Sequence, residues 1–161
     1  SLILDAAIEA HAGATALVVP EADIELRLVD VADAVDAIVH VAGSDAAWGG
    51  VFNISALYPS SHELAGLVAA ELGLTVELDA ASGAGRGLKE RAAIRDRMLA
   101  AGMRGDILLT PRRVHLLHRA NRNNRLSIDA LARAGFAPRR TDLAAGIAET
   151  VAWYRENRWI V

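Results

Sequence analysis

The stretch Ile24-Glu25-Leu26-Arg27-Leu28-Val29-Asp30-Val31, together with the helical pattern that follows it, carries the clearest fold signal in the chain. Every second residue from Ile24 to Leu28 is a large apolar residue, and this period of two is typical of a β-strand. From Asp33 onward the apolar positions change to helical spacing, and the helix is expected to end at Gly43. These positions are Ala34, Val35, Ile38, Val39 and Ala42. A strand that leads directly into a helix is the basic unit of an α/β fold.

The alternation of strands and helices extends in both directions from this stretch. Ser60 and Glu63 have the spacing of a capping box, which predicts that a helix follows them. The expected strands are 16–19, 51–54 and 74–78, and the other expected helices are 2–10, 63–72, 88–101, 128–134 and one that starts at Thr141 or Asp142. This order of elements places the chain in the α/β class.

The composition is that of one globular unit, or of one piece of a larger protein. Hydrophobic residues make up 53% of the 161 residues and charged residues 23%, a balance typical of a folded chain rather than a disordered one. No apolar run approaches the roughly 20 residues that a membrane-spanning helix needs. No secretion signal is apparent, so we expect a cytoplasmic protein. The absence of cysteine excludes disulfides, a thiolate nucleophile and cysteine-based zinc sites.

The net charge of −3 conceals a strong division between the two halves of the chain. Residues 1–80 contain 13 acidic side chains and a single basic one, Arg27. Residues 81–161 contain 7 acidic and 16 basic side chains. Such a division predicts a basic surface in the second half that meets an anionic ligand or partner.

The densest basic segment spans 112–125 and contains five arginines, two histidines and no acidic residue. Planar guanidinium groups bind phosphate in a bidentate manner, so a small ligand that carries phosphate fits this segment. Nucleic acid fits it less well, because no aromatic residues are interleaved with the arginines and the whole chain is acidic. The plain alternative is a solvated arginine face, or a set of ion pairs with the acidic first half.

Two further patterns are too weak to assign a cofactor or a metal. Gly83, Gly85 and Gly87 lie between a strand and a helix, but their spacing differs from the G-x-G-x-x-G of dinucleotide-binding loops. His115 and His118 stand three residues apart without a clear third ligand. We therefore assign no catalytic, cofactor-binding or metal-binding residue to this chain.

Three stretches carry a resemblance to a known family. The first is Arg27-Leu28-Val29-Asp30-Val31-Ala32-Asp33-Ala34-Val35-Asp36-Ala37-Ile38. The second is Gly50-Val51-Phe52-Asn53-Ile54, followed by Ser60-Ser61 and a helix that ends at Leu72-Gly73. The third comprises residues 127–138 (SIDALARAGFAP) and 143–155 (LAAGIAETVAWYR). In this order they resemble phrases of the extended short-chain dehydrogenase/reductases, which include NAD(P)-dependent epimerases and dehydratases.

In that family all three phrases belong to the carboxy-terminal half of the enzyme. The amino-terminal half carries a G-x-x-G-x-x-G cofactor loop and a Tyr-x-x-x-Lys catalytic pair. Neither motif occurs here, because Tyr58 and Tyr154 are followed four residues later by His62 and Arg158. The resemblance implies that residues 1–161 are the substrate-binding, C-terminal part of a Rossmann-type enzyme. NAD or NADP would be bound by an amino-terminal part absent from this chain, and most of the cofactor-binding sheet would be missing with it.

The resemblance also implies a substrate and the residues that bind it. Family members act on sugar nucleotides or on related hydroxy or carbonyl compounds, and an arginine of the first phrase contacts the diphosphate. Leu26 occupies the aligned position here, with Arg27 beside it. The family often supplies a second phosphate-binding arginine from the region of 112–125. The expected substrate-binding residues are Arg27, Arg113, Arg119 and Arg122.

On this interpretation the chain is inactive alone and needs its own amino-terminal half or a partner chain, with no membrane and no nucleic acid involved. A homo-oligomer is compatible with the same pattern. The alternative is a cofactor-free binding or interaction module derived from that fold. In that case a partner or self-association would cover the open edge of the strand expected at 51–54.

Overall fold

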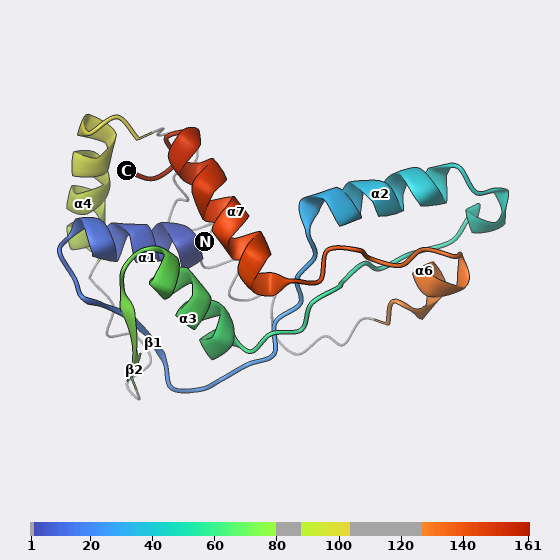
Figure 1. The fold of residues 1–161 in the computed structure, drawn as a ribbon, viewed down its shortest axis with the longest axis horizontal. Helices are drawn as coiled ribbons and strands as arrows, with labels where there is room; N and C mark the ends of the chain where they lie inside the picture. The colour runs from blue at the N-terminus through green and yellow to red at the C-terminus, as the bar shows by residue number, and fades with distance from the viewer. Residues whose placement is uncertain (1, 80–87, 104–126) are drawn as a thin grey trace.

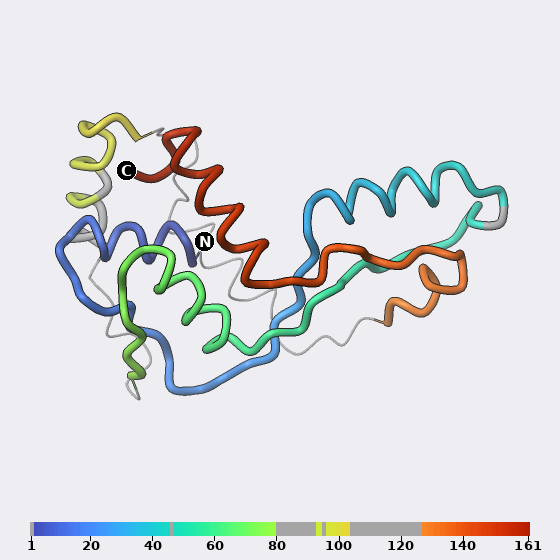
Figure 2. The backbone as a smooth tube through the Cα atoms, viewed as in Figure 1, coloured from blue at the N-terminus to red at the C-terminus, as the bar shows by residue number. Residues whose placement is uncertain are grey.

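The computed structural model of the chain describes residues 2–79, 88–103 and 127–161 (Figures 1 and 2). Within these ranges the chain forms six α-helices, one short 3-10 helix and two β-strands. Their order is α1 (Leu2–His11), β1 (Ala16–Pro20), α2 (Val31–Ala42), the 3-10 helix η1 (Asp45–Ala47), α3 (Ser61–Glu71), β2 (Thr75–Asp79), α4 (Leu88–Ala100), α6 (Asp129–Arg133) and α7 (Leu143–Glu156). The fold is mixed α/β, as the sequence predicts.

Strands β1 and β2 pair in parallel and form a small two-stranded sheet. The register places Ala16 opposite Thr75 and Pro20 opposite Asp79. Parallel strands need a long crossover connection, and here that connection contains α2, η1 and α3. Both strands lie where the sequence pattern predicts them.

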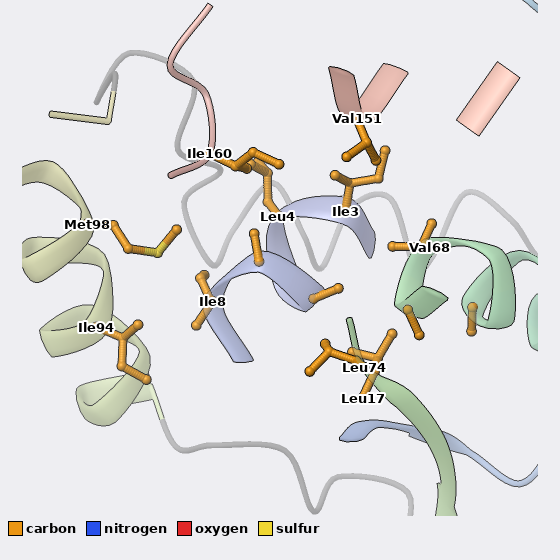
Figure 3. Close-up of a cluster of buried hydrophobic side chains, with 14 of the residues drawn as sticks. Ile3, Leu4, Ile8, Leu17, Val68, Leu74, Ile94, Met98, Val151 and Ile160 are labelled. Atoms are coloured by element: carbon orange, nitrogen blue, oxygen red, sulfur yellow. The ribbon is translucent and has the colours of Figure 1, made fainter. Parts of the chain in front are cut away.

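Helix α1 lies at the centre of the hydrophobic core (Figure 3). It contacts α3, α4 and β1, and α7 packs against α3. The buried side chains of α1 are Ile3, Leu4, Ala6, Ala7 and Ile8. The core also includes Leu17, Val68, Leu74, Ile94, Met98, Val151 and Ile160. We refer to α1, β1, α3, β2, α4 and α7 as the core lobe.

The elements α2, η1 and α6 lie together at the other end of the molecule, joined to the core lobe by extended segments (Figure 1). We call residues 24–60 and 127–142 the arm. No member of the hydrophobic core cluster found in the described residues belongs to the arm. Its buried apolar side chains in the described part of the chain are Ala37, Ala47, Pro59 and Leu131. The arm therefore depends heavily on polar contacts for its shape.

The prediction of a strand over 24–31 is wrong. This segment runs antiparallel to 57–60, but it forms only isolated bridges. The N–H of Leu26 donates to the carbonyl of Pro59 at 2.8 Å, yet proline has no N–H with which to complete the pair. The ladder is therefore interrupted between its two bridges, which join Glu25 to Ser60 and Leu28 to Leu57.

The prediction of a strand over 51–54 is also wrong. None of the N–H groups of these residues donates to a backbone carbonyl within the described part of the chain. The segment is tied instead by a side chain, because Asn53 Nδ2 donates to the carbonyl of Ser127 at 3.2 Å. A strand exists only beside a neighbour that completes its ladder, and the described residues provide none.

Three helices begin at capping side chains. Ser60 accepts from the N–H of Glu63 at 3.1 Å and starts α3, as predicted. Asp142 starts α7 in the same way. Helix α2 begins two residues earlier than expected, because Asp30 accepts from the N–H of Ala32 at 2.8 Å. This shift places Asp33 inside the helix rather than at its end.

Candidate functional site

Acidic side chains recur at every third residue at the start of α2. They are Asp30, Asp33 and Asp36, and this spacing places them near one another along the helix. Asp33 has no exposed surface at all, whereas Asp36 remains partly exposed. A buried carboxylate is costly unless it is hydrogen-bonded and paired with positive charge. The position of Asp33 therefore demands partners.

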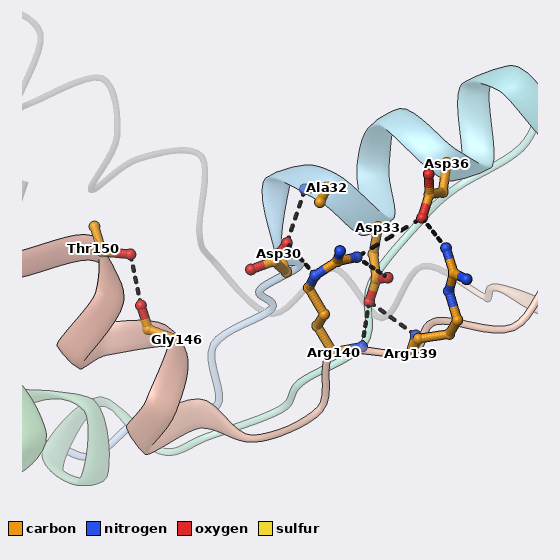
Figure 4. A network of polar contacts seen from close by, with 8 residues as sticks. All are labelled: Asp30, Ala32, Asp33, Asp36, Arg139, Arg140, Gly146 and Thr150. Carbon is orange, nitrogen blue, oxygen red and sulfur yellow. Dashed lines mark hydrogen bonds and ion pairs between the residues drawn. The ribbon is translucent and has the colours of Figure 1, made fainter. Parts of the chain in front are cut away.

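Those partners are Arg139 and Arg140, which lie just before α7 (Figure 4). Their backbone N–H groups donate to Asp33 Oδ2 at 3.0 and 2.8 Å, and Arg140 Nη1 donates to Asp33 Oδ1 at 3.2 Å. The guanidinium of Arg140 lies 3.7 Å from both Asp30 and Asp36, and Arg139 pairs with Asp36. We call these five residues the carboxylate–arginine cluster.

The cluster keeps Asp33 ionised despite its burial. Desolvation alone would raise the pKa of Asp33. The hydrogen bonds from the N–H groups of Arg140 and Arg139 and from the Arg140 guanidinium outweigh desolvation and lower the pKa below its ordinary value. The carboxylate therefore acts as a fixed negative charge that holds the chain before α7 against α2.

A cavity of about 610 Å³ opens beside the cluster, between the starts of α2 and α7. Its walls combine apolar side chains with carboxylates, guanidinium groups and threonine hydroxyls. A second cavity of about 720 Å³ shares Leu57 and residues 141–143 with the first and continues toward Leu67 of α3. The first cavity is lined by Leu28, Val31, Leu57, Ile147, Asp30, Asp142, Glu149, Thr141, Thr150, Arg139 and Arg140, among others.

The charges around the first cavity do not favour an anion. Asp30 and Asp142 occupy the positive ends of α2 and α7 as their caps. Arg140 is surrounded by the carboxylates of its own cluster. With Glu149 added, three carboxylates and two guanidinium groups line the cavity. This arrangement favours a ligand rich in hydroxyl groups over a phosphate group.

Of the predicted substrate-binding residues, Arg27 is the one that lies in the described part of the chain. Its Nη2 donates to Glu25 Oε1 at 3.0 Å, and its buried Nε has no hydrogen-bond partner among the described residues. Arg27 does not line either cavity. Arg113, Arg119 and Arg122 lie outside the described residues, so convergence of the four arginines stays a prediction.

Other sequence patterns fall in the same undescribed ranges. Gly83, Gly85 and Gly87 lie there, as do His115 and His118. In the residues that the structure describes, no group of three His, Cys, Asp or Glu side chains is placed to hold a metal ion. Nor does any helix in that part of the chain have the length and apolar character to cross a membrane.

Asp23, Ser61 and His62 meet at the start of α3 but do not form a catalytic triad. The Ser61 hydroxyl donates to Asp23 Oδ1 at 2.8 Å rather than to the imidazole. His62 Nε2 lies 2.9 Å from the carbonyl of Pro20, and Nδ1 lies 3.8 Å from Asp23 Oδ2. A serine nucleophile needs a base to accept its proton, and His62 does not face the hydroxyl. These contacts therefore hold the start of α3 against the end of β1 and the loop that follows β1.

The same contacts shift the titration of Asp23. Desolvation raises the pKa, but hydrogen bonds from the Ser61 hydroxyl and the His62 N–H outweigh it and lower the pKa to about 2. Asp23 is consequently a structural carboxylate that is ionised at neutral pH.

Sequence reasoning missed the residues that form the carboxylate–arginine cluster and its cavity. Two signals pointed to them: acidic residues three apart at Asp30, Asp33 and Asp36, and adjacent arginines just after Pro138. Neither signal gives the contact between segments more than 100 residues apart, because that pairing depends on the tertiary fold. Comparison of the chain with protein-family models, with curated proteins and with solved structures found no match.

Proposed function

We propose that this chain is the substrate-binding part of an NAD(P)-dependent epimerase, dehydratase or reductase of the extended short-chain dehydrogenase/reductase type. Its substrate would be a sugar nucleotide or a related hydroxy or carbonyl compound. The proposal rests on the three sequence phrases, and one structural observation supports it most strongly: hydrogen bonds join the second phrase to the third and tie the first phrase to the two arginines between the segments of the third.

These hydrogen bonds involve each phrase or the residues directly beside it. Asp33 of the first phrase accepts from Arg139 and Arg140, which directly follow Pro138 at the end of the first segment of the third phrase. Asn53 of the second phrase donates to the carbonyl of Ser127 in the third. The helix of the second phrase is also joined to the third, because Arg155 Nη2 donates to the carbonyl of Glu71 at 2.8 Å. Segments far apart in sequence thus form one connected structural unit, as expected if the three phrases belong to one folded part of the family's enzymes.

The chain's role in this reaction would be binding and orientation. Hydride transfer at a hydroxyl or carbonyl carbon would use nicotinamide together with a tyrosine and a lysine on the amino-terminal part. The residues described here would hold the hydroxyl-bearing portion of the substrate in the cavity beside the carboxylate–arginine cluster. Glu149 and the Thr141 hydroxyl are hydrogen-bond acceptors on its wall. Phosphate groups would be left to the predicted Arg113, Arg119 and Arg122.

Calorimetric titration of the isolated chain with a panel of sugar nucleotides that includes UDP-glucose tests this role. Gly146 lines the cavity, and a Cβ at this position would meet nothing within 4 Å. A Gly146→Leu variant should therefore occupy ligand space and abolish binding. Gly66→Leu is the matched control, because Gly66 is also helical with open space around it but does not line either cavity. Equal binding by both variants, or no binding by the unmodified chain, would count against the proposal.

The cofactor-free interaction module remains the second candidate function, and one observation favours it. The apolar positions of α2 are exposed to solvent: Val31, Val35, Ile38 and Val39 have between 52% and 77% of their surface accessible. An exposed apolar patch is a common feature of surfaces that bind another protein.

A further inference from the structure

The second cavity, of about 720 Å³, continues the first one and is not used by the proposed function. The two cavities share Leu57 and residues 141–143, so a substituent on a sugar held in the first cavity would extend into the second. Tyr58, Glu63 and Leu67 are among the residues that line the second cavity and not the first. The second cavity therefore offers its own set of contacts to one part of a substrate.

Most of the wall of the second cavity is apolar, with leucine side chains from the arm, α3 and α7. These are Leu57, Leu67 and Leu143. A group with an apolar part would remove their surface from water, which favours binding. Among the described residues no arginine, lysine or histidine lines this cavity, and its two charged side chains are the carboxylates of Glu63 and Asp142. The second cavity therefore suits a partly apolar group and excludes a phosphate.

Glu63 is the carboxylate that is available to a ligand on this wall. The other one, Asp142, is already engaged, because its Oδ1 accepts from the N–H of Ala145 at 3.0 Å. The N–H of Glu63 donates to Ser60 Oγ at 3.1 Å, but its exposed carboxylate has no hydrogen bond or ion pair with a described residue. An ionised carboxylate only accepts hydrogen bonds. Glu63 therefore favours a ligand group that carries an N–H or O–H donor.

Tyr58 supplies a hydrogen-bond donor on the same wall. The residue is 46% exposed, and its phenolic hydroxyl can donate to an acceptor on a ligand. A simple hydroxyl substituent would leave the leucine side chains uncovered, and a hydrocarbon would leave Glu63 without a donor. An ammonium group has no acceptor for Tyr58. A secondary amide with an apolar acyl end satisfies the carboxylate, the hydroxyl and the leucines together.

We propose that the second cavity binds an acylamino group of the substrate, which is then the nucleotide derivative of an N-acylated amino sugar. The amide N–H donates to the Glu63 carboxylate, the acyl carbonyl accepts from the Tyr58 hydroxyl, and the acyl methyl group contacts Leu57 and Leu67. This inference rests on the proposed function and deepens it, because it names the class of sugar that the two cavities select.

Calorimetric titration of the chain with UDP-N-acetylglucosamine and with UDP-glucose tests the proposal, because the two compounds differ in this one substituent. We expect the acetamido compound to bind about tenfold more tightly, the effect of one hydrogen bond to a charged group. Ala144→Leu should bring the ratio of the two affinities close to one, because Ala144 lines the second cavity. Ala152→Leu is the matched control: it alters another exposed alanine of α7 that lines neither cavity, so the ratio should persist.

Two further titrations identify the group that is recognised. Glu63→Gln keeps the size of the side chain but removes its charge, so the preference for the acetamido compound should decrease. UDP-glucosamine, which carries an ammonium group in place of the amide, should bind more weakly than UDP-N-acetylglucosamine. Equal affinities for UDP-N-acetylglucosamine and UDP-glucose, or tighter binding of UDP-glucosamine, would overturn this inference and leave the proposed function standing. Failure of all three compounds to bind would contradict the proposed function, and the inference would be lost with it.

Discussion

The backbone N–H of Arg140 donates a 2.8 Å hydrogen bond to the buried carboxylate of Asp33, which lies 107 residues earlier in the chain. This contact joins the acidic first half of the chain to its basic second half. It also fixes the position of α7 relative to α2, because Arg140 lies three residues before the start of α7. The sequence offers ion pairs with the acidic first half as one alternative for the arginines of 112–125, which lie outside the described residues. In the described residues such pairs form at Arg139 and Arg140.

Asp33→Asn should destabilise the protein more than Asp36→Asn. The first substitution removes a buried negative charge and leaves the Arg140 guanidinium short of a partner, whereas Asp36 is partly exposed and solvated. Urea denaturation followed by circular dichroism measures both free energies of unfolding. Equal urea midpoints for the two variants would mean that the buried Asp33 contributes no more to the free energy of unfolding than a surface ion pair does.

Stability should fall in acid because of Asp33 and Asp23. Both carboxyl groups have pKa values lowered in the folded state, from the ordinary value of 3.8 to about 2 for Asp23. The stability they contribute is fully present above the ordinary pKa and is lost as the pH falls through the folded pKa. Denaturation midpoints between about pH 5 and pH 2 should therefore decrease, and less steeply in Asp33→Asn than in the unmodified chain. An identical slope in that variant would show that Asp33 titrates normally.

Gly146→Ala and Gly66→Ala should each raise the free energy of unfolding by up to about 1 kcal/mol, because glycine is less favourable than alanine inside a helix by roughly that amount. Neither position has neighbours within 4 Å of an added Cβ, so no steric cost opposes the gain. Thermal unfolding of both variants gives the comparison. A loss of stability in Gly146→Ala but not in Gly66→Ala would indicate that other atoms of the protein already fill the space beside the start of α7.

Leu4→Ala in α1 should cost about 2–5 kcal/mol, the range found for buried leucine truncations. Leu78→Ala removes the same atoms from an exposed position in β2 and should change stability by no more than about 0.5 kcal/mol. Leu4 is 6% exposed and Leu78 is 52% exposed. Chemical denaturation of the two variants measures the difference, and similar values would contradict the central position of α1 in the core.

Sequence pattern predicts the elements that have strong local signals. Helix α3 begins at the expected cap, and strands β1 and β2 lie where the apolar runs place them. The strand predicted over 24–31 fails because its ladder runs opposite Pro59, which has no N–H, and local alternation cannot detect a partner strand. Helix α2 shows the same limit: its periodicity locates the helix, but the side that faces the chain is set by Asp33 and its distant arginines.

The candidate site shows the same limit: the sequence can name individual residues, but only the fold shows which of them lie together. Resemblance to a family led to Arg27, Arg113, Arg119 and Arg122, of which Arg27 pairs with Glu25 and lines neither cavity. The residues that do line the first cavity come from segments that meet only in the folded chain. Their charges suit hydroxyl groups, a preference that composition alone does not give.

Hydrogen exchange of the chain, measured by mass spectrometry with and without ligand, tests the proposed function most directly. With a sugar nucleotide that binds in the calorimetric panel, we predict slower exchange in segments 28–31 and 139–150, which supply the lining of the cavity beside the carboxylate–arginine cluster. With NAD or NADP we predict no change in the same segments. Protection by the nicotinamide nucleotide, or protection by the sugar nucleotide confined to other parts of the chain, would contradict the assignment of this chain as the substrate-binding part.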